Sequence, residues 1–230
     1  MSIMHVSIFP SKNERHVALG GVAGYERNLV EAISKNNHER QYVLCQRYSN
    51  TASCTRDGRF VVLSSFKKGV MFWVPIILLA RRINPRVVHI QQEMFMFGGP
   101  ITSLMLVAIV AILRRYNVIV TIHGVVTFKD ITRDFMRINR SLLPAWLTKF
   151  VFKLIYSGLC QAAMKVIVHE KAFSDALVDD YYCDRNNIYV VPHGIESAEK
   201  MSSTLARKKL FLPETVRIVL FMGYAAVIRE

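Results

Sequence analysis

Near the middle of the sequence lies VIVTIHG, residues 118–124, in which five β-branched residues lead directly to His123 and Gly124. A short run of such residues predicts a buried strand. Open α/β sheets bind ligands at the carboxyl ends of their strands, which is where His123 is expected. An imidazole can accept a proton or donate a hydrogen bond near neutral pH. His123 is therefore a candidate functional residue, the alternative being that it merely ends the strand.

Strand-like and helix-like segments alternate on both sides of this run. Further strands are expected at residues 3–9, 41–45, 60–63, 87–90, 166–169 and 188–191, and helices at residues 25–33, 70–83, 101–113, 145–160 and 174–182. Strands that are apolar along their whole length are typical of a parallel sheet covered on both faces. We therefore predict an α/β fold of this kind, followed by a helix at 205–210 and a strand at 216–222 that begin a second domain.

The chain is strongly basic. Its 30 Lys and Arg residues against 17 Asp and Glu residues give a formal charge of +13, and 52% of its 230 residues are hydrophobic. Such a composition supports a buried core and favours anionic partners such as phosphate groups, nucleic acid or an acidic membrane surface.

The cysteines and the N-terminal residues indicate a cytoplasmic protein. No two of the four cysteines have the C-x-x-C spacing of a zinc or redox site, and residues 1–6 lack the features of a signal peptide. Residues 94–113 carry no charge, which makes a transmembrane helix an alternative. Because Gly98, Gly99 and Pro100 interrupt this segment, we favour a helix buried between the sheet and its neighbours.

Basic and large apolar residues are interleaved in residues 125–160. The basic ones include Lys129, Arg133, Arg137, Arg140, Lys149 and Lys153. A region of this composition can lie on an anionic bilayer, although the same residues could simply be solvated. An anionic membrane surface is therefore a candidate partner, and the inner face of the membrane a candidate location.

A glycine-rich loop, GGVAG at residues 20–24, separates the first strand from the first helix. A strand, a glycine loop and a helix in this order present backbone N–H groups to a phosphate, and glycine permits the close approach of a ligand. A simple tight turn is the alternative.

These motifs, taken in order, resemble the N-terminal half of a retaining GT-B glycosyltransferase of family 4. The matching segments are the loop at 20–22, VHIQQE at 88–93, VTIHG at 120–124, VIVH at 166–169, IYVVPHGI at 188–195 and LFMGY at 220–224. The resemblance implies a Rossmann-like acceptor-side domain at 1–196, a linker at 197–203 and the beginning of a truncated donor-binding domain at 204–230. Because each follows a strand-like run directly, we expect Gly20, Glu93 and His123 at the same, carboxyl-terminal edge of the sheet.

The resemblance further implies transfer of a sugar from a nucleotide sugar to a glycan or lipid-linked acceptor, with no metal or other cofactor. His123 would be the catalytic residue beside the reacting sugar. The residues implied in donor binding are Gly20, Gly21, Val22, Gly124 and Arg229, and those implied in acceptor binding are Tyr25, Gln92 and Glu93. Arg229 would take the place of the family's phosphate-binding lysine, but Glu230 departs from the glycine that often follows it.

The family's Glu-x7-Glu motif belongs to the donor-binding domain, so the same spacing of Glu31 and Glu39 in the first domain is a coincidence. We expect the 230-residue chain to be inactive without a further C-terminal domain, supplied in cis or as a separate chain. The alternative function is a non-catalytic basic α/β domain that binds a membrane surface or nucleic acid. Because the sequence lacks a nucleic-acid-binding motif, we expect no nucleic-acid partner.

Overall fold

The computed structural model describes residues 2–10, 21–47, 52–139, 141, 143–194 and 200–219. The chain forms two compact units, Met1–Gly194 and Ile195–Glu230, and each is described by itself.

The first unit is built on an eight-stranded sheet with the strand order β3-β4-β2-β1-β5-β6-β7-β8. Its strands are β1 Ser2–Ser7, β2 Arg40–Gln46, β3 Ser53–Asp57, β4 Phe60–Phe66, β5 Val87–Gln92, β6 Val118–Ile122, β7 Lys165–Val168 and β8 Ile188–Val190. All neighbouring strands are parallel except β3 and β4. The predicted Rossmann-like parallel sheet is confirmed.

Strand β3 was not predicted from the sequence. Its residues, SCTRD, are mostly exposed at the edge of the sheet, so they lack the apolar pattern by which a buried strand is recognised. The available signal was Asp57-Gly58, a pair typical of hairpin turns, and Gly58 indeed has a φ of +59°.

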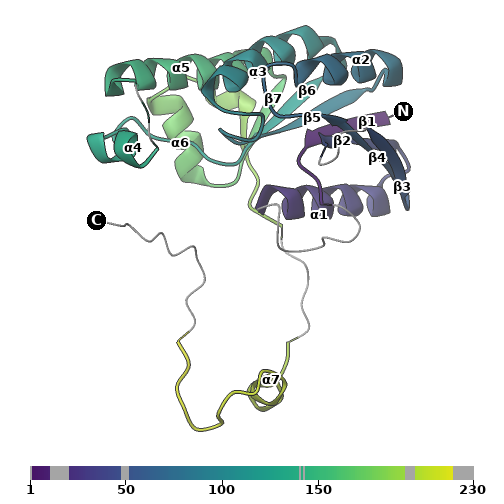
Figure 1. Ribbon diagram of the computed structural model, residues 1–230, viewed down its shortest axis with the longest axis vertical. Coiled ribbons are helices and arrows are strands. Elements are labelled where there is room, and N and C mark those ends of the chain that lie inside the picture. The colour runs from purple at the N-terminus through teal and green to yellow at the C-terminus, as the bar shows by residue number, and fades with distance from the viewer. Residues whose placement is uncertain are drawn as a thin grey trace. The chain divides into compact units, whose positions relative to one another are not determined.

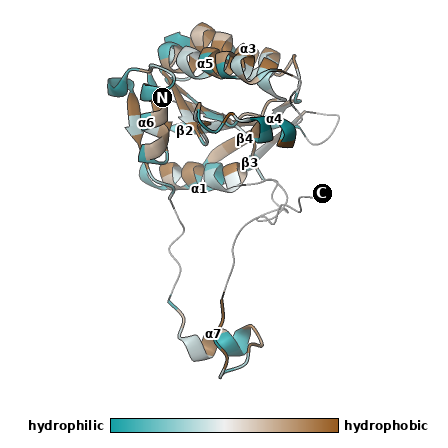
Figure 2. Ribbon diagram, turned by 90° about the vertical axis from the view of Figure 1, so that its left-hand side faces the viewer, coloured by the Kyte–Doolittle hydropathy of each residue, from teal (hydrophilic) through white to brown (hydrophobic). Residues whose placement is uncertain are grey.

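Helices cover both faces of the sheet, as predicted. They are α1 Gly21–Asn36, α2 Trp73–Ile83, α3 Pro100–Leu113, α4 Arg133–Ile138, α5 Ala145–Ala162 and α6 Lys171–Asp179. Helices α2, α3 and α5 lie on one face and α1 lies on the other (Figure 1). Figure 2 shows the same layers from the side, with α3 hydrophobic along most of its length.

The uncharged segment 94–113 forms turns followed by the 14-residue helix α3. This helix packs against α2 and α5, and Leu106, Val110 and Leu113 are buried in the core. The predicted buried helix is therefore confirmed. Within the described ranges, no helix is both long enough and apolar enough to cross a membrane.

The second unit contains helix α7, Ser203–Lys209, close to the predicted helix at 205–210. Residues 216–219 form no strand, contrary to the prediction, and residues 220–222 lie outside the described part. An apolar run becomes a strand only when another strand accepts its backbone hydrogen bonds, and the described residues of this unit supply none. The assignment of 204–230 to a donor-binding domain stays a prediction.

Candidate functional site

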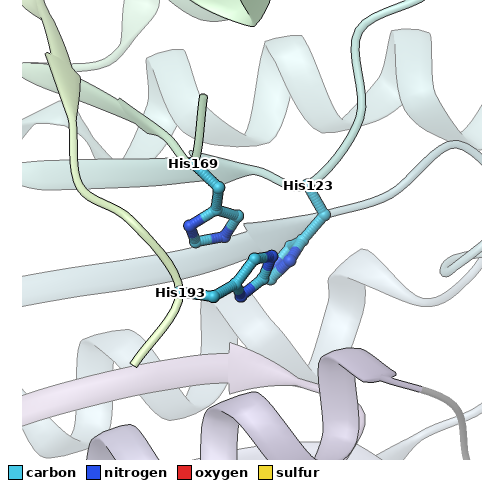
Figure 3. Close-up of side chains that lie close together, drawn as sticks. All are labelled: His123, His169 and His193. Atoms are coloured by element: carbon cyan, nitrogen blue, oxygen red, sulfur yellow. The ribbon is translucent and has the colours of Figure 1, made fainter. Parts of the chain in front are cut away.

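Three histidines meet at the carboxyl edge of the sheet. His123 follows β6 and His169 follows β7, and His193 lies three residues after β8. Because these strands are parallel neighbours, their carboxyl ends lie side by side. The ring centroid of His169 is 4.8 Å from that of His123 and 3.6 Å from that of His193, and Figure 3 shows the three rings gathered together.

Only His123 was predicted as a site residue. The sequence did carry a signal for His169 and His193, because each comes at or near the end of a strand-like run in the same way as His123. The proximity of the three rings depends on the strand order, which periodicity does not reveal.

The ring of Tyr25, in the first turns of α1, packs edge-on against all three imidazoles. Its centroid lies 5.1 Å from that of His123, 4.9 Å from that of His169 and 5.3 Å from that of His193. Burial raises the pKa of Tyr25, and the neighbouring Glu26 carboxylate raises it further. The phenol therefore stays neutral and can donate a hydrogen bond at the mouth of the site.

A hydrogen bond orients the His123 ring. Its Nε2 lies 2.8 Å from the Oε1 of Gln91 on β5. Since an amide oxygen only accepts, Nε2 carries the proton and Nδ1 keeps a free lone pair. Burial lowers the pKa of His123 to about 3, and the nearby His169 and His193 contribute to the shift. His123 is thus a neutral imidazole at physiological pH.

Behind His123 lies a network of buried polar side chains. Glu26 and His5 are both fully buried, and the Oε1 of Glu26 is 2.9 Å from the Nδ1 of His5. The other ring nitrogen of His5 lies 3.1 Å from the Oε1 of Gln41. Both nitrogens of His5 therefore lie close to side-chain oxygen atoms. Burial alone would raise the pKa of Glu26, but its interaction with the adjacent His5 holds the pKa below its ordinary value.

The network changes the way in which stability depends on pH. Burial lowers the pKa of His89 to about 4 and that of His123 to about 3, whereas the unfolded chain binds these protons near pH 6.5. Between the folded-state pKa values and about pH 6.5, the unfolded state therefore binds more protons than the folded state. We expect the free energy of unfolding to fall as the pH drops below about 6.5, by about 1.4 kcal/mol per pH unit for each histidine.

Urea denaturation at pH 7 and pH 5 measures this effect. His123→Ala is expected to remove about one proton's share of the slope. Equal stability of the wild type at both pH values would contradict the prediction.

The structure places the other predicted residues as follows. Gly21 is exposed at the start of α1, and Gly124 and Glu93 are exposed at the sheet edge. Val22 is buried, so only its backbone is available to a donor. Gln92 is also buried, and because side chains alternate along a strand it points to the opposite face from Gln91, which contacts His123. Gly20, Arg140 and Arg229 lie outside the described residues. The donor and acceptor roles stay predictions.

Glu93 and His123 directly follow the adjacent parallel strands β5 and β6, and His123 N–H donates a hydrogen bond to the carbonyl of Gln92 over 3.0 Å. The predicted placement of these two residues at one edge is confirmed. The site therefore combines the neutral imidazole of His123, two further imidazoles, a phenol and open backbone near Gly21 and Gly124. These groups are suited to hydrogen bonding with hydroxyl groups and to packing against the face of a sugar ring.

Comparison with known proteins identifies the family. The profile of Glycosyltransferase Family 4 matches residues 19–199. Sucrose-phosphate synthase from Thermosynechococcus elongatus superposes with a TM-score of 0.60 at 14% identity, over 92% of this chain and 53% of that one. A second structure of that synthase gives a TM-score of 0.50 at 12% identity, over 84% and 90% of the two chains. No curated protein sequence matches this chain.

At these identities the solved structures establish the fold alone, and this chain spans about half the length of the first synthase chain. The family profile covers every strand from β2 to β8 and all three histidines. The chain therefore belongs to glycosyltransferase family 4, and its eight-stranded unit is the N-terminal domain of a GT-B fold.

Proposed function

We propose that this domain takes part in transferring a sugar from a nucleotide sugar to a glycan or lipid-linked acceptor, with retention of configuration and without a metal requirement. The observation that carries the proposal is the neutral, oriented imidazole of His123 at the carboxyl edge of a family 4 domain. A donor-binding domain would hold the nucleotide and meet the leaving diphosphate.

The tautomer of His123 suggests what its imidazole does. With Nε2 donating to Gln91, Nδ1 can accept a hydrogen bond from a hydroxyl group of the transferring sugar. This contact increases the electron density on that hydroxyl oxygen and so favours positive charge on the sugar ring. Positive charge develops on the ring in an oxocarbenium-like transition state, and a group oriented before the reaction stabilises it without further reorganisation.

A two-part assay tests the proposal. We expect the 230-residue chain alone to transfer no sugar, and a protein that joins it to a donor-binding domain to transfer sugar with retention. The reason is that transition-state stabilisation requires groups from both sides of the cleft. Release of nucleoside diphosphate and the anomeric configuration of the product are the measurements. Inversion at the anomeric carbon, or transfer by the isolated chain, would contradict the proposal.

We also propose that the domain binds an anionic membrane surface through the outer face of α5. Trp146, Phe150 and Leu154 are exposed there at helical spacing, with Lys149 and Lys153 between them. The Nζ of Lys153 lies 4.4 Å from the ring centroid of Tyr182, which is also exposed. A face of exposed aromatic residues beside lysines is typical of interfacial helices.

We expect the protein to bind vesicles that contain an anionic lipid, and to bind them less at high salt, because the Debye length is only about 10 Å at 0.1 M salt. Lys149→Glu with Lys153→Glu is expected to abolish binding in a cosedimentation assay. Arg81→Glu with Arg82→Glu makes the same charge change on exposed residues of α2 and serves as the control. Equal binding to neutral vesicles would reject the proposal.

A further inference from the structure

We propose that His123, His169 and His193 together bind a divalent transition-metal ion, with Zn²⁺ the best match. One potential ligand atom from each residue lies within 4.8 Å of the other two, and the three side chains converge in Figure 3. This metal site goes beyond the proposed sugar transfer. The ion would take the Nδ1 lone pair of His123 that the sugar hydroxyl uses, so metal and sugar would compete for this residue.

His169 provides the firmest evidence. Its Nδ1 lies 2.9 Å from the carbonyl oxygen of Val191, and a carbonyl only accepts, so Nδ1 carries the proton. The lone pair is then on Nε2. This atom is buried in a side chain that is only 4% exposed, and it has no hydrogen-bond partner among the described residues. A water molecule or an ion can satisfy such a buried atom, and a metal ion accepts this lone pair.

The His123 ring likewise has one protonated nitrogen and one free lone pair. Its Nε2–H donates to the Oε1 of Gln91, which leaves the Nδ1 lone pair free. Metal-binding histidines in proteins usually donate their second ring N–H to an oxygen acceptor, which fixes the tautomer and the direction of the ring. Both His123 and His169 show this outer hydrogen bond in the described structure.

His193 completes the set from the exposed segment after β8. Its ring lies against that of His169, with the ring centroids 3.6 Å apart. Two nitrogens bound to the same Zn²⁺ are about 3.4 Å apart, because each Zn–N bond is about 2.0–2.1 Å in tetrahedral geometry. The three nitrogens now lie within 4.8 Å of one another, and the rings of His169 and His193 are stacked, so metal binding requires the exposed His193 ring to turn.

The set of ligands also suits Zn²⁺. The ring of Tyr25 lies beside all three imidazoles, with its centroid 4.9–5.3 Å from theirs. Three imidazoles with a fourth position left to water or another oxygen ligand form a set that Zn²⁺ accepts in proteins.

Metal titration of the 230-residue protein tests the proposal. We expect one equivalent of Zn²⁺ to bind in calorimetry, and one equivalent of Co²⁺ to give the intense visible bands of a tetrahedral site without thiolate charge transfer. His193→Ala is the main variant, because this exposed residue contributes little to the core, and circular dichroism checks its fold. It should weaken binding at least about 10-fold, since even the loss of an outer-shell partner costs about 10–100-fold.

Two further variants test whether binding depends on the three-histidine cluster. Gln91→Met removes the acceptor of the His123 hydrogen bond and is expected to weaken binding about 10–100-fold. His38→Ala removes an exposed histidine outside the cluster and is expected to bind the metal like the wild type. The proposal is overturned if His193→Ala binds as tightly as the wild type, if no stoichiometric binding occurs, or if the Co²⁺ spectrum shows thiolate ligands.

Discussion

Replacing His123 with alanine is expected to lower the kcat of sugar transfer by about 100-fold or more, the scale found when one preorganised hydrogen-bonding group is lost. The variant is made in a protein that joins this domain to a donor-binding domain. His123 lies at the edge of the sheet, outside the hydrophobic core, so the fold should survive its replacement. The effect should therefore appear in kcat at an almost unchanged Tm.

Steady-state kinetics with a matched thermal melt measure this effect, and His38→Ala provides the matched control because it removes an exposed imidazole elsewhere. Gln91→Met should lower kcat by a smaller factor than His123→Ala, since it frees the ring without removing it. An unchanged kcat in His123→Ala would remove this residue from the mechanism. If His123→Ala and Gln91→Met lower kcat and also lower the Tm by similar amounts, the two residues have a structural role instead.

The second large effect concerns stability. His5→Leu is expected to lower the free energy of unfolding by about 3–5 kcal/mol, because it leaves the fully buried carboxylate of Glu26 without its partner. The double variant His5→Leu with Glu26→Met removes both polar groups. It should recover much of that loss, since an apolar pair of similar size often replaces a buried ion pair at little cost.

Urea denaturation of the wild type, the two single variants and the double variant completes a double-mutant cycle. The pH dependence gives an independent check. The pKa of Glu26 is lowered in the folded state, so its contribution to stability is present above about pH 4.5 and is lost as the pH falls towards the folded pKa. Additive losses in the double variant would show that His5 and Glu26 do not act as a pair.

Local sequence patterns were sufficient for the class of fold and for the position of His123. The runs of β-branched residues at β5, β6 and β7 predicted buried strands because a strand covered on both faces has no polar side. The residue after such a run necessarily lies at the carboxyl edge of a parallel sheet. His123 and Glu93 could therefore be placed together before their contacts were known.

Local patterns failed where pairing or exposure decides the structure. Strand β3 is polar because one side of an edge strand faces solvent, and its pairing with β4 follows from the turn at Gly58. Residues 216–219 have the composition of a strand, but no described strand of their unit pairs with them.

The meeting of His123 with His169 and His193, and the burial of Glu26 against His5, depend on which strands become neighbours and on where α1 lies. Such contacts join residues up to 70 positions apart in the sequence. A strand's own residues determine that it is buried and which of its side chains share a face. Its neighbours are selected by the packing of the whole domain. The side chains that meet at the sheet edge can therefore be identified only in the folded chain.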